Sequence, residues 1–468
     1  AQRDLDAATR YVPPVVTPTR AGGFDQKIAI IGAGPAGLSC AFYLAEKGYR
    51  PVVFEKNEHP GGMLTYGIPS FKLQKDVIEA EVEVIRLMGA EFRYGVEVGR
   101  DVTLDELRAQ GFKAFYVAIG CQGGRLAGIP GEDAEDVTVA VDFLREVNSG
   151  KIDALPGRTI VVGGGNVAID VARNACRLGS EHVEMFCLES EAQMPASEEE
   201  RREGVEDGAH ISCGWGPKEI HLDEAGRVCG ITFKRCTRVF DDEGRFAPEY
   251  DENDLRRVDA DRVVMSIGQS IVWGDLLAGS KVELGRGQGA LADPQTYQTA
   301  EPDIFVGGDV YTGPSFAIDA IAAGHEAAVS IHRFVQPGST LTIGRNQRRY
   351  TSLDRDDAVI ESYDNASREV AHVDREREKA APFSEYVETF SEEQVRAETA
   401  RCLGCGASIV DPNKCIGCGL CTTKCAFDAI HLDRDRPECS TMVKYEQKLP
   451  SLGKYALKHA IKIKFGKK

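Results

Sequence analysis

The chain of 468 residues lacks several features that define other classes of protein. It has no uninterrupted apolar run of about 18 residues and no visible secretory signal peptide, so we expect no membrane span. It is short of positive charge, with a net charge of −17, which argues against a nucleic-acid partner. Tryptophan is rare, but hydrophobic residues make up 42% of the chain, and the length allows two or three domains with their own cores.

Paired cysteines are missing from the first 400 residues. The seven cysteines in that part form no C-x2-C or C-x4-C pair, which argues against a disulfide relay beside a flavin, and we expect them to be small buried side chains. These are Cys40, Cys121, Cys176, Cys187, Cys213, Cys229 and Cys236. The other seven fall between Cys402 and Cys439, with a spacing that favours metal sites in a reducing, cytoplasmic compartment.

Residues 27–56 contain a complete dinucleotide-binding βαβ pattern. An apolar run predicts a buried parallel strand. The sequence GAGPAG follows it and predicts a tight turn that leads into a helix. Gly32 permits the tight turn, Gly34 lets the backbone approach a pyrophosphate, and Gly37 allows close packing of helix on strand. A second apolar run ends on Glu55, about 20 residues later, at the position that binds ribose hydroxyls. The stretch therefore predicts a nucleotide site.

The same pattern recurs at residues 159–189. A strand leads into the turn GGGNVA, then come a helix and a second strand that ends on Glu189. A carboxylate at that position accepts hydrogen bonds from both adenosine ribose hydroxyls and repels a 2′-phosphate, so Glu189 predicts a preference for NAD(H) over NADP(H). Arg201 and Arg202 are nearby in the sequence and keep a phosphate-binding alternative open.

Further apolar runs predict the remaining strands of the two sheets. Two apolar runs of similar sequence, one ending at Gly120 and the other at Gly268, each predict a strand. We also expect a short strand at 96–98. A strand at 304–306 precedes Asp309, which therefore lies at a strand's carboxyl end, where ligands of open α/β sheets bind.

A cysteine-rich module occupies residues 396–445. A C-x2-C pair begins at Cys402, and the C-x2-C-x2-C-x3-C run from Cys415 is the bacterial ferredoxin signature. We predict iron–sulfur clusters, with zinc as the alternative. Two [4Fe–4S] clusters need eight ligands and the region has seven cysteines. We favour two clusters, whose eighth ligand would be a residue other than cysteine or would come from elsewhere, and the alternative is one cluster with spare thiols. The predicted ligands are Cys402, Cys405, Cys415, Cys418, Cys421, Cys425 and Cys439.

Charged segments flank this module on both sides. Residues 341–395 are predicted to be a linker that wraps over the surface, and Ser391 with Gln394 forms a capping box that starts a helix. The tail at 446–468 has the pattern of a basic amphipathic helix. It either docks a partner or another part of the chain, or is a solvated cap.

These motifs resemble the glutamate synthase small-subunit family of flavoproteins, whose module is shared with dihydropyrimidine dehydrogenase and the large subunit of NADH-dependent ferredoxin:NADP oxidoreductase. The matching stretches are IGAGPAGL, GGMLTYGIPSFKL, VAIG, GGGNVAIDVAR, MPA, SIG and VGGD. The resemblance implies an α/β fold of two Rossmann-type, glutathione-reductase-like nucleotide-binding domains, one inserted in the other, and a small C-terminal ferredoxin-like iron–sulfur domain. The expected segments are a lead-in at 1–24, an FAD domain at 25–140 and 275–340, an NAD(H) domain at 141–274, a linker at 341–395, a ferredoxin-like domain at 396–445 and a tail at 446–468.

The resemblance also implies FAD and a set of cofactor-binding residues. On the FAD side these are Gly32, Gly34, Ala36, Gly37, Glu55, Gly62, Leu64, Gly67, Ile68, Gly120, Asp309, Ala317 and Ile318. On the nicotinamide side they are Gly164, Gly165, Asn166, Val167, Glu189 and Gly268. Two features depart from the family pattern. The family's cysteine region ahead of the flavin motif is absent, and Cys187-Leu188-Glu189 replaces the Tyr-Arg-Arg of NADPH-using members, in agreement with the charge argument.

Together these features predict an NAD(H)-linked flavin and iron–sulfur electron-transfer subunit. We expect hydride transfer between NADH and FAD to depend on how the protein positions the two cofactors, so no catalytic side chain is assigned. Single electrons would then pass through the clusters to or from a partner redox subunit or ferredoxin, with electron bifurcation in a larger complex as one form of this activity. The alternatives are the small subunit of a glutamate synthase and a scaffold in which only the clusters carry electrons.

Overall fold

The computed structural model describes residues 23–343, 345, 367–401, 415–424, 430–432 and 445–465. The chain divides into two units, the first made of residues 1–343 and 362–402 and the second of residues 344–361 and 403–468. Nearly all of the predicted lead-in at 1–24 lies outside the described residues. Each unit is described by itself below.

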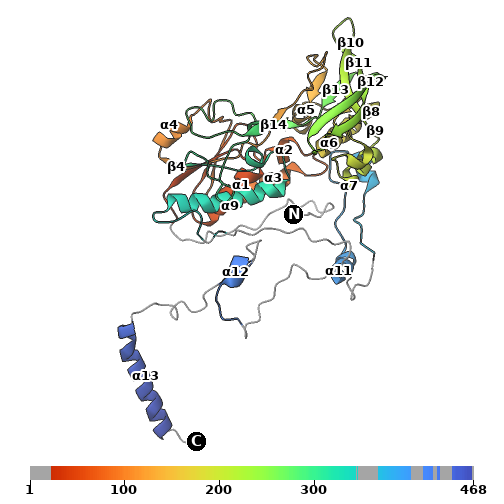
Figure 1. Ribbon diagram of the computed structural model, residues 1–468. Coiled ribbons are helices and arrows are strands. Elements are labelled where there is room, and N and C mark those ends of the chain that lie inside the picture. Colours follow the sequence, from red (N-terminus) through yellow and green to blue (C-terminus); the bar gives the residue numbers. More distant parts are fainter. Residues whose placement is uncertain are drawn as a thin grey trace. The chain divides into compact units, whose positions relative to one another are not determined.

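A five-stranded parallel sheet with helices on both faces forms the first part of unit 1 (Figure 1). Its elements are β1 (Lys27–Ile31), α1 (Pro35–Glu46), β2 (Val52–Glu55), α2 (Met63–Tyr66), α3 (Lys75–Leu87), β3 (Glu91–Tyr94), α4 (Leu104–Ala109), β4 (Phe112–Val117), β15 (Ile304–Val306), α8 (Asp309–Thr312) and α9 (Ala317–Val335). The strand order is β15-β4-β1-β2-β3. Ile28 and Ile30 face a core shared with α1, α3 and α9, whereas Ala29 and Ile31 face the core beneath α4. This two-residue period is that of a strand buried on both faces.

The chain between β4 and β15 builds a second five-stranded parallel sheet, in the order β6-β13-β7-β8-β9. Its elements are β6 (Val137–Val139), α5 (Ala140–Asn148), β7 (Arg158–Val162), α6 (Asn166–Arg177), β8 (His182–Cys187), α7 (Glu198–Glu206), β9 (His210–Cys213) and β13 (Arg262–Met265). Val161 faces the core under α5 and α6. Ile160 and Val162 face a core shared with an antiparallel sheet of β10 (Trp215–Leu222), β11 (Val228–Phe240) and β12 (Phe246–Val258).

Short elements complete the described chain. They are β5 (Gly123–Gly124), which pairs with β14 (Gln269–Ser270), the 3-10 turns η1 (Glu191–Gln193) and η2 (Arg286–Gln288), and the helices α10 (Arg375–Ala380), α11 (Glu392–Ala400), α12 (Leu420–Lys424) and α13 (Tyr445–Phe465). The predicted capping box is confirmed, because Ser391 accepts a hydrogen bond from the backbone of Gln394 at the start of α11. None of the described helices is both long and apolar enough to cross a membrane.

Two expectations are corrected by the structure. The short strand predicted at 96–98 is wrong, since only Val98 pairs there, in an isolated bridge with Val102. The scattered cysteines are not all buried. Four of them are partly exposed, namely Cys176, Cys213, Cys229 and Cys236.

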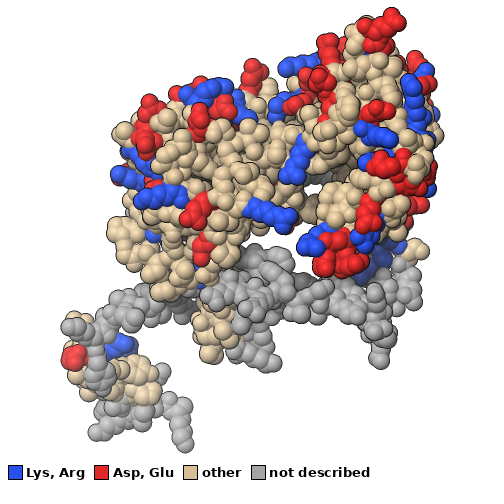
Figure 2. Space-filling model, turned by 45° about the horizontal axis from the view of Figure 1, so that its top comes forward, with Lys and Arg blue, Asp and Glu red and all other residues tan. Residues whose placement is uncertain are grey.

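On the face in Figure 2, acidic and basic side chains are interspersed and do not segregate into a patch of one sign.

Candidate functional site

A cavity of about 670 Å³ opens where the strands of the first sheet end. Its walls include Ile31, Glu55, Gly120 and Gly307, which lie at or just beyond the carboxyl ends of β1, β2, β4 and β15. Open parallel sheets bind ligands at this edge, and the volume is that of a typical cofactor or ligand pocket.

At two positions of the first glycine-rich turn there is no room for a side chain. Gly32 has a φ of +104°, and a Cβ there would lie 2.4 Å from the carbonyl oxygen of Ala118. A Cβ on Gly37 would lie 1.9 Å from the carbonyl oxygen of Gly32. No side chain caps α1 at its N-cap, Gly34, which lines the cavity. The free N–H groups and the helix dipole at this end are suited to a pyrophosphate.

The carboxylate of Glu55 is buried beside this turn, with 3% of the residue exposed. It accepts hydrogen bonds from the backbone N–H of Ala33 at 2.8 Å and from the backbone and side-chain nitrogens of Asn57 at 2.9 and 2.8 Å. A carboxylate has about four acceptor positions, so one is left for a hydroxyl donor. Together with the uncapped helix, this arrangement fits the adenosine ribose and pyrophosphate of FAD.

The loop around α2 forms the side wall of the cavity through Gly62, Leu64, Gly67 and Ile68. Its backbone carbonyl groups accept hydrogen bonds from a side chain on α3 and from a side chain on α5. Lys75 donates to the carbonyls of Leu64 and Ile68, and Asn148 on α5 donates to those of Tyr66 and Ile68. Burial lowers the pKa of Lys75 to about 8. These bonds fix a glycine-rich wall that has little side-chain bulk.

The far end of the cavity carries Asp309 and the start of α9. Burial raises the pKa of Asp309, and a hydrogen bond from the Ser315 backbone partly offsets this rise. Phe316 and Ala317 line the cavity, whereas Ile318 is outside its lining and is 67% exposed.

The second glycine-rich turn reaches the same cavity from the other sheet. Gly165, Asn166 and Val167 line it, as does Asp170 one turn further along α6. A Cβ at Gly165 would meet no atom within 4 Å, so there is room for a ligand against the backbone.

The predicted cofactor-binding residues therefore fall into two groups. Those that line the cavity are Gly32, Gly34, Ala36, Glu55, Gly62, Leu64, Gly67, Ile68, Gly120, Asp309, Ala317, Gly165, Asn166 and Val167. Those outside its lining are Gly37, Ile318, Gly164, Glu189 and Gly268. Gly37 packs against Gly32, and Gly164 lies under the Glu189 carboxylate, where its Cβ would be 3.0 Å from Oε2.

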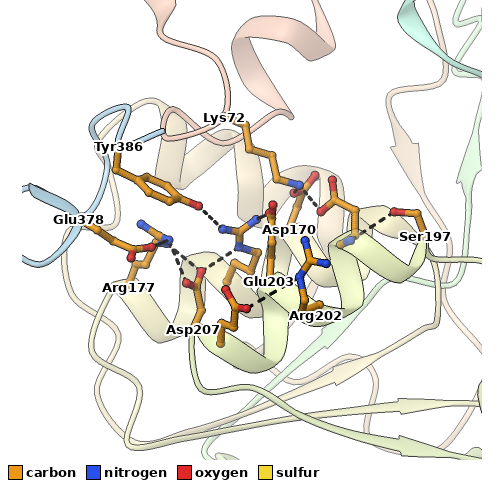
Figure 3. Close-up of polar contacts among 12 residues, drawn as sticks. Lys72, Asp170, Arg177, Ser197, Arg202, Glu203, Asp207, Glu378 and Tyr386 are labelled. Carbon is orange, nitrogen blue, oxygen red and sulfur yellow. Dashed lines mark hydrogen bonds and ion pairs between the residues drawn. The ribbon is translucent and has the colours of Figure 1, made fainter. Parts of the chain in front are cut away.

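The sequence analysis missed several lining residues, among them the charged residues Lys56, Glu97 and Asp170. Asp170 makes a contact between the two sheets' helices and loops. Its Oδ1 lies 2.6 Å from Nζ of Lys72, which also pairs with Glu200 (Figure 3). Lys72 comes from the segment between α2 and α3, residues 67–74, which we call the flavin-side loop, and the two acids come from α6 and α7. Asp170 is four residues after Asn166, so helical spacing places both on one face and could have revealed it.

We expect Asp170→Asn to flatten the dependence of stability on pH. Burial raises the pKa of Asp170 to about 6 from an ordinary 3.8, although Lys72 opposes the shift. The folded protein therefore holds this proton more tightly than the unfolded chain. The stabilisation is complete below the unfolded pKa and is lost as the pH rises through about 6.

Urea unfolding at a series of pH values between about 4 and 8 measures this effect. The wild type should lose roughly 2–3 kcal/mol more than the Asn variant over that range. Asp242→Asn, at a side chain that is 92% exposed, is the control and should follow the wild type. Equal pH slopes for Asp170→Asn and the wild type would contradict the assignment.

The cysteine module belongs to unit 2 from residue 403 onward. Cys415 and Cys418 are exposed and Cys421 lies on α12, while Gly417 and Gly419 between them have φ of +66° and +76°. Such backbone angles let a short loop wrap a cluster, and thiolates are the ligands that iron–sulfur clusters use. Within the described residues no three ligating side chains are gathered around one point. The other predicted ligands, Cys402, Cys405, Cys425 and Cys439, lie outside the described residues.

Comparisons with known proteins agree with the cavity of unit 1 and, separately, with the cysteine module. Residues 26–324 match the family model for pyridine nucleotide-disulphide oxidoreductase, and residues 408–431 match that for the 4Fe-4S binding domain. The chain is 35% identical over 399 residues to the NADP(+)-dependent formate dehydrogenase subunit beta of Moorella thermoacetica, which covers 81% of this chain and 54% of that protein. It is 35% identical over 330 residues to the glutamate synthase (NADPH) small chain of Escherichia coli, covering 66% and 69%.

Solved structures share the fold. FprA from Mycobacterium tuberculosis in complex with NADPH matches with a TM-score of 0.57 and 20% identity, covering 66% of this chain and 84% of that one. The predicted family resemblance and the predicted fold class, with its C-terminal iron–sulfur module, are confirmed by these matches. The chain spans about half the length of the first curated relatives it matches.

Proposed function

Because the chain belongs to the pyridine nucleotide-disulphide oxidoreductase family and is an FAD-dependent NAD(P)H oxidoreductase, we propose that it is the nicotinamide-side subunit of a flavin and iron–sulfur electron-transfer complex. Its preferred dinucleotide is NADH, and its acceptor or donor is another redox subunit or ferredoxin. When bound, FAD supplies the exchange between two-electron hydride transfer and single-electron transfer, and the cysteine module supplies the single-electron path through two [4Fe–4S] clusters.

One observation carries this proposal: both glycine-rich turns line one cavity. Gly34 and Glu55 come from the first sheet, and Gly165 and Asn166 come from the second. A flavin held by the first turn and a dinucleotide held by the second would therefore share one cavity. Orientation of the two reactants is the main requirement for hydride transfer, so no acid or base is needed.

The preference for NADH rests on the position of Glu189. Its carboxylate lies over Gly164 in the second turn, where the adenosine ribose of a bound dinucleotide is expected, and a 2′-phosphate would be repelled. The two arginines named as alternatives differ. Arg202 pairs with Glu206 on its own helix, whereas Arg201 donates to the carbonyl of Glu191 near Glu189. Arg201 is therefore the arginine that would bind a 2′-phosphate if the chain used NADP(H). The names of the two relatives described above give NADP(+) or NADPH as the dinucleotide of those proteins.

Anaerobic titration with NADH and, separately, NADPH tests the proposal, with flavin bleaching followed by absorbance and cluster reduction by EPR. We expect fast reduction by NADH and slow reduction by NADPH. Glu189→Ser should reduce the ratio of the two second-order rate constants by about tenfold or more, because the repulsion is removed. Glu191→Ser removes the same charge from an exposed position two residues away and should change nothing. A wild type that prefers NADPH would overturn the selectivity.

A glutamate synthase small subunit is the second candidate, favoured by the similarity to the Escherichia coli small chain. The match to the formate dehydrogenase subunit extends over 81% of this chain and the match to the small chain over 66%. That difference favours the electron-transfer subunit. Glutamate formation from glutamine and 2-oxoglutarate on addition of a glutamate synthase large subunit would favour the second candidate. Reduction by neither dinucleotide would favour the scaffold alternative.

A further inference from the structure

The two halves of the cavity are joined by polar contacts at the base of the flavin-side loop. Lys72, four residues after the lining residue Ile68, pairs with Asp170 and Glu200 of the second sheet's helices (Figure 3). Domains of one chain move relative to each other by default unless their interface is large or firmly held. The contacts at this joint therefore decide how well the nicotinamide half faces the flavin half.

An aromatic ring next to Lys72 strengthens the joint. Phe71 is buried, and the guanidinium carbons of Arg173 and Arg177 lie 4.8 and 4.1 Å from the centre of its ring. Both arginines are on α6, the helix that carries Asn166 and Asp170 to the cavity. Cation–π contacts of this kind are strongest when they are desolvated.

A third segment closes over this joint from far along the chain. Phe383 lies with its ring 6.4 Å from that of Phe71, and its carbonyl accepts a hydrogen bond from Gln74 of the flavin-side loop at 3.2 Å. Pro382 and Glu378 accept from Arg177, each at 2.6 Å. The segment therefore contacts both halves of the cavity at once.

Tyr386 completes the partners of Arg173, the most deeply buried cation in the part of the chain that the structure describes. The Arg173 residue is 1% exposed, and its guanidinium binds Glu203 on α7, Asp207 at the end of α7, and the hydroxyl of Tyr386 at 2.7 Å. Tyr386 is itself 6% exposed. A buried guanidinium that loses a partner pays its desolvation without compensation, so the segment's attachment and the position of α6 depend on each other.

We propose that residues 378–386 form a clamp that holds α6 against the flavin-side loop, and that Arg173, Arg177 and Tyr386 are positioning residues for hydride transfer, although none of them lines the cavity. The clamp rests on the proposed function, since hydride transfer is the step that it would align.

Stopped-flow reduction of the purified flavin-containing protein by NADH tests the clamp in Tyr386→Phe. We expect the limiting rate of flavin bleaching to fall by about fivefold with little change in the NADH concentration at half saturation, because only the alignment is altered. Tyr94→Phe is the matched control. It also removes a hydroxyl bound by an arginine, Arg86, but at the edge of the first sheet, and should behave as the wild type. If Tyr386→Phe does not fold, Phe383→Leu replaces it with the same expectation.

Hydrogen exchange of the same proteins without NADH gives a second readout. Amides of residues 63–75 and 166–177 should exchange faster in Tyr386→Phe than in the wild type or Tyr94→Phe. Wild-type exchange in these peptides, or a wild-type limiting rate, would overturn the clamp. If neither dinucleotide reduces the wild-type flavin, the proposed function fails and hydrogen exchange alone decides whether the clamp exists.

Discussion

The Gly37→Ala protein is expected to retain less than about a tenth of the wild-type flavin. The new Cβ would lie 1.9 Å from the carbonyl oxygen of Gly32 and 3.2 Å from a methyl group of Ile30. Both neighbours belong to the strand and turn that present α1 to the cavity, and the backbone contact cannot be relieved by a side-chain rotation. The turn must therefore open and the N-terminus of α1 must move away from the pyrophosphate position.

Flavin released from denatured protein, measured by absorbance against protein concentration, gives the occupancy. Far-UV circular dichroism shows whether the two sheets still form. Gly289→Ala is the control, because its Cβ would make only ordinary contacts of 3.7 and 3.9 Å at a φ that alanine tolerates. Full flavin occupancy in Gly37→Ala would contradict the assigned role of this turn.

Cys418→Ala is expected to abolish electron delivery to ferredoxin while leaving reduction of the flavin by NADH intact. Cys418 is the central cysteine of the C-x2-C-x2-C run, and loss of one thiolate leaves an iron of the cluster without its ligand. The rate of ferredoxin reduction should fall more than about tenfold, since the single-electron path is broken.

Iron and sulfide analysis of the same protein separates the two cluster counts. Iron should fall by about half if the module holds two [4Fe–4S] clusters and almost completely if it holds one. Cys236→Ala, a partly exposed cysteine on β11 outside the spacing, is the control and should keep all of its iron. Unchanged iron and unchanged ferredoxin reduction in Cys418→Ala would remove this cysteine from the ligand set.

Local steric requirements made much of the first sheet predictable. Gly32, Gly37 and Glu55 are constrained by neighbours within one strand–turn–helix unit and the adjoining strands, so their spacing in the sequence indicates the geometry. The start of α11 was predictable for the same reason, because a capping box involves residues three apart. The strand expected at 96–98 failed because its apolar residues pack into the core without a ladder partner, apart from Val98.

Contacts across the chain could not be predicted in this way. Residues 341–395 read as a charged surface linker, yet Tyr386 within them is buried against Arg173, which lies 213 residues earlier. Similarly, Lys72 and Asp170 are unremarkable charges in the sequence and become an ion pair beside the cavity only when the two sheets pack together.

The sequence by itself determined the two nucleotide-binding units, the cysteine module and the acid at the end of each second strand, because each depends on short-range backbone sterics and on ligand spacing along one segment. The tertiary structure alone decided that both glycine-rich turns open into one cavity and that a distant segment contacts both α6 and the flavin-side loop. These features depend on which surfaces of the two sheets and their helices are buried against each other within unit 1. That choice is made by packing and by the full partnering of buried charges, neither of which has a fixed spacing in the chain.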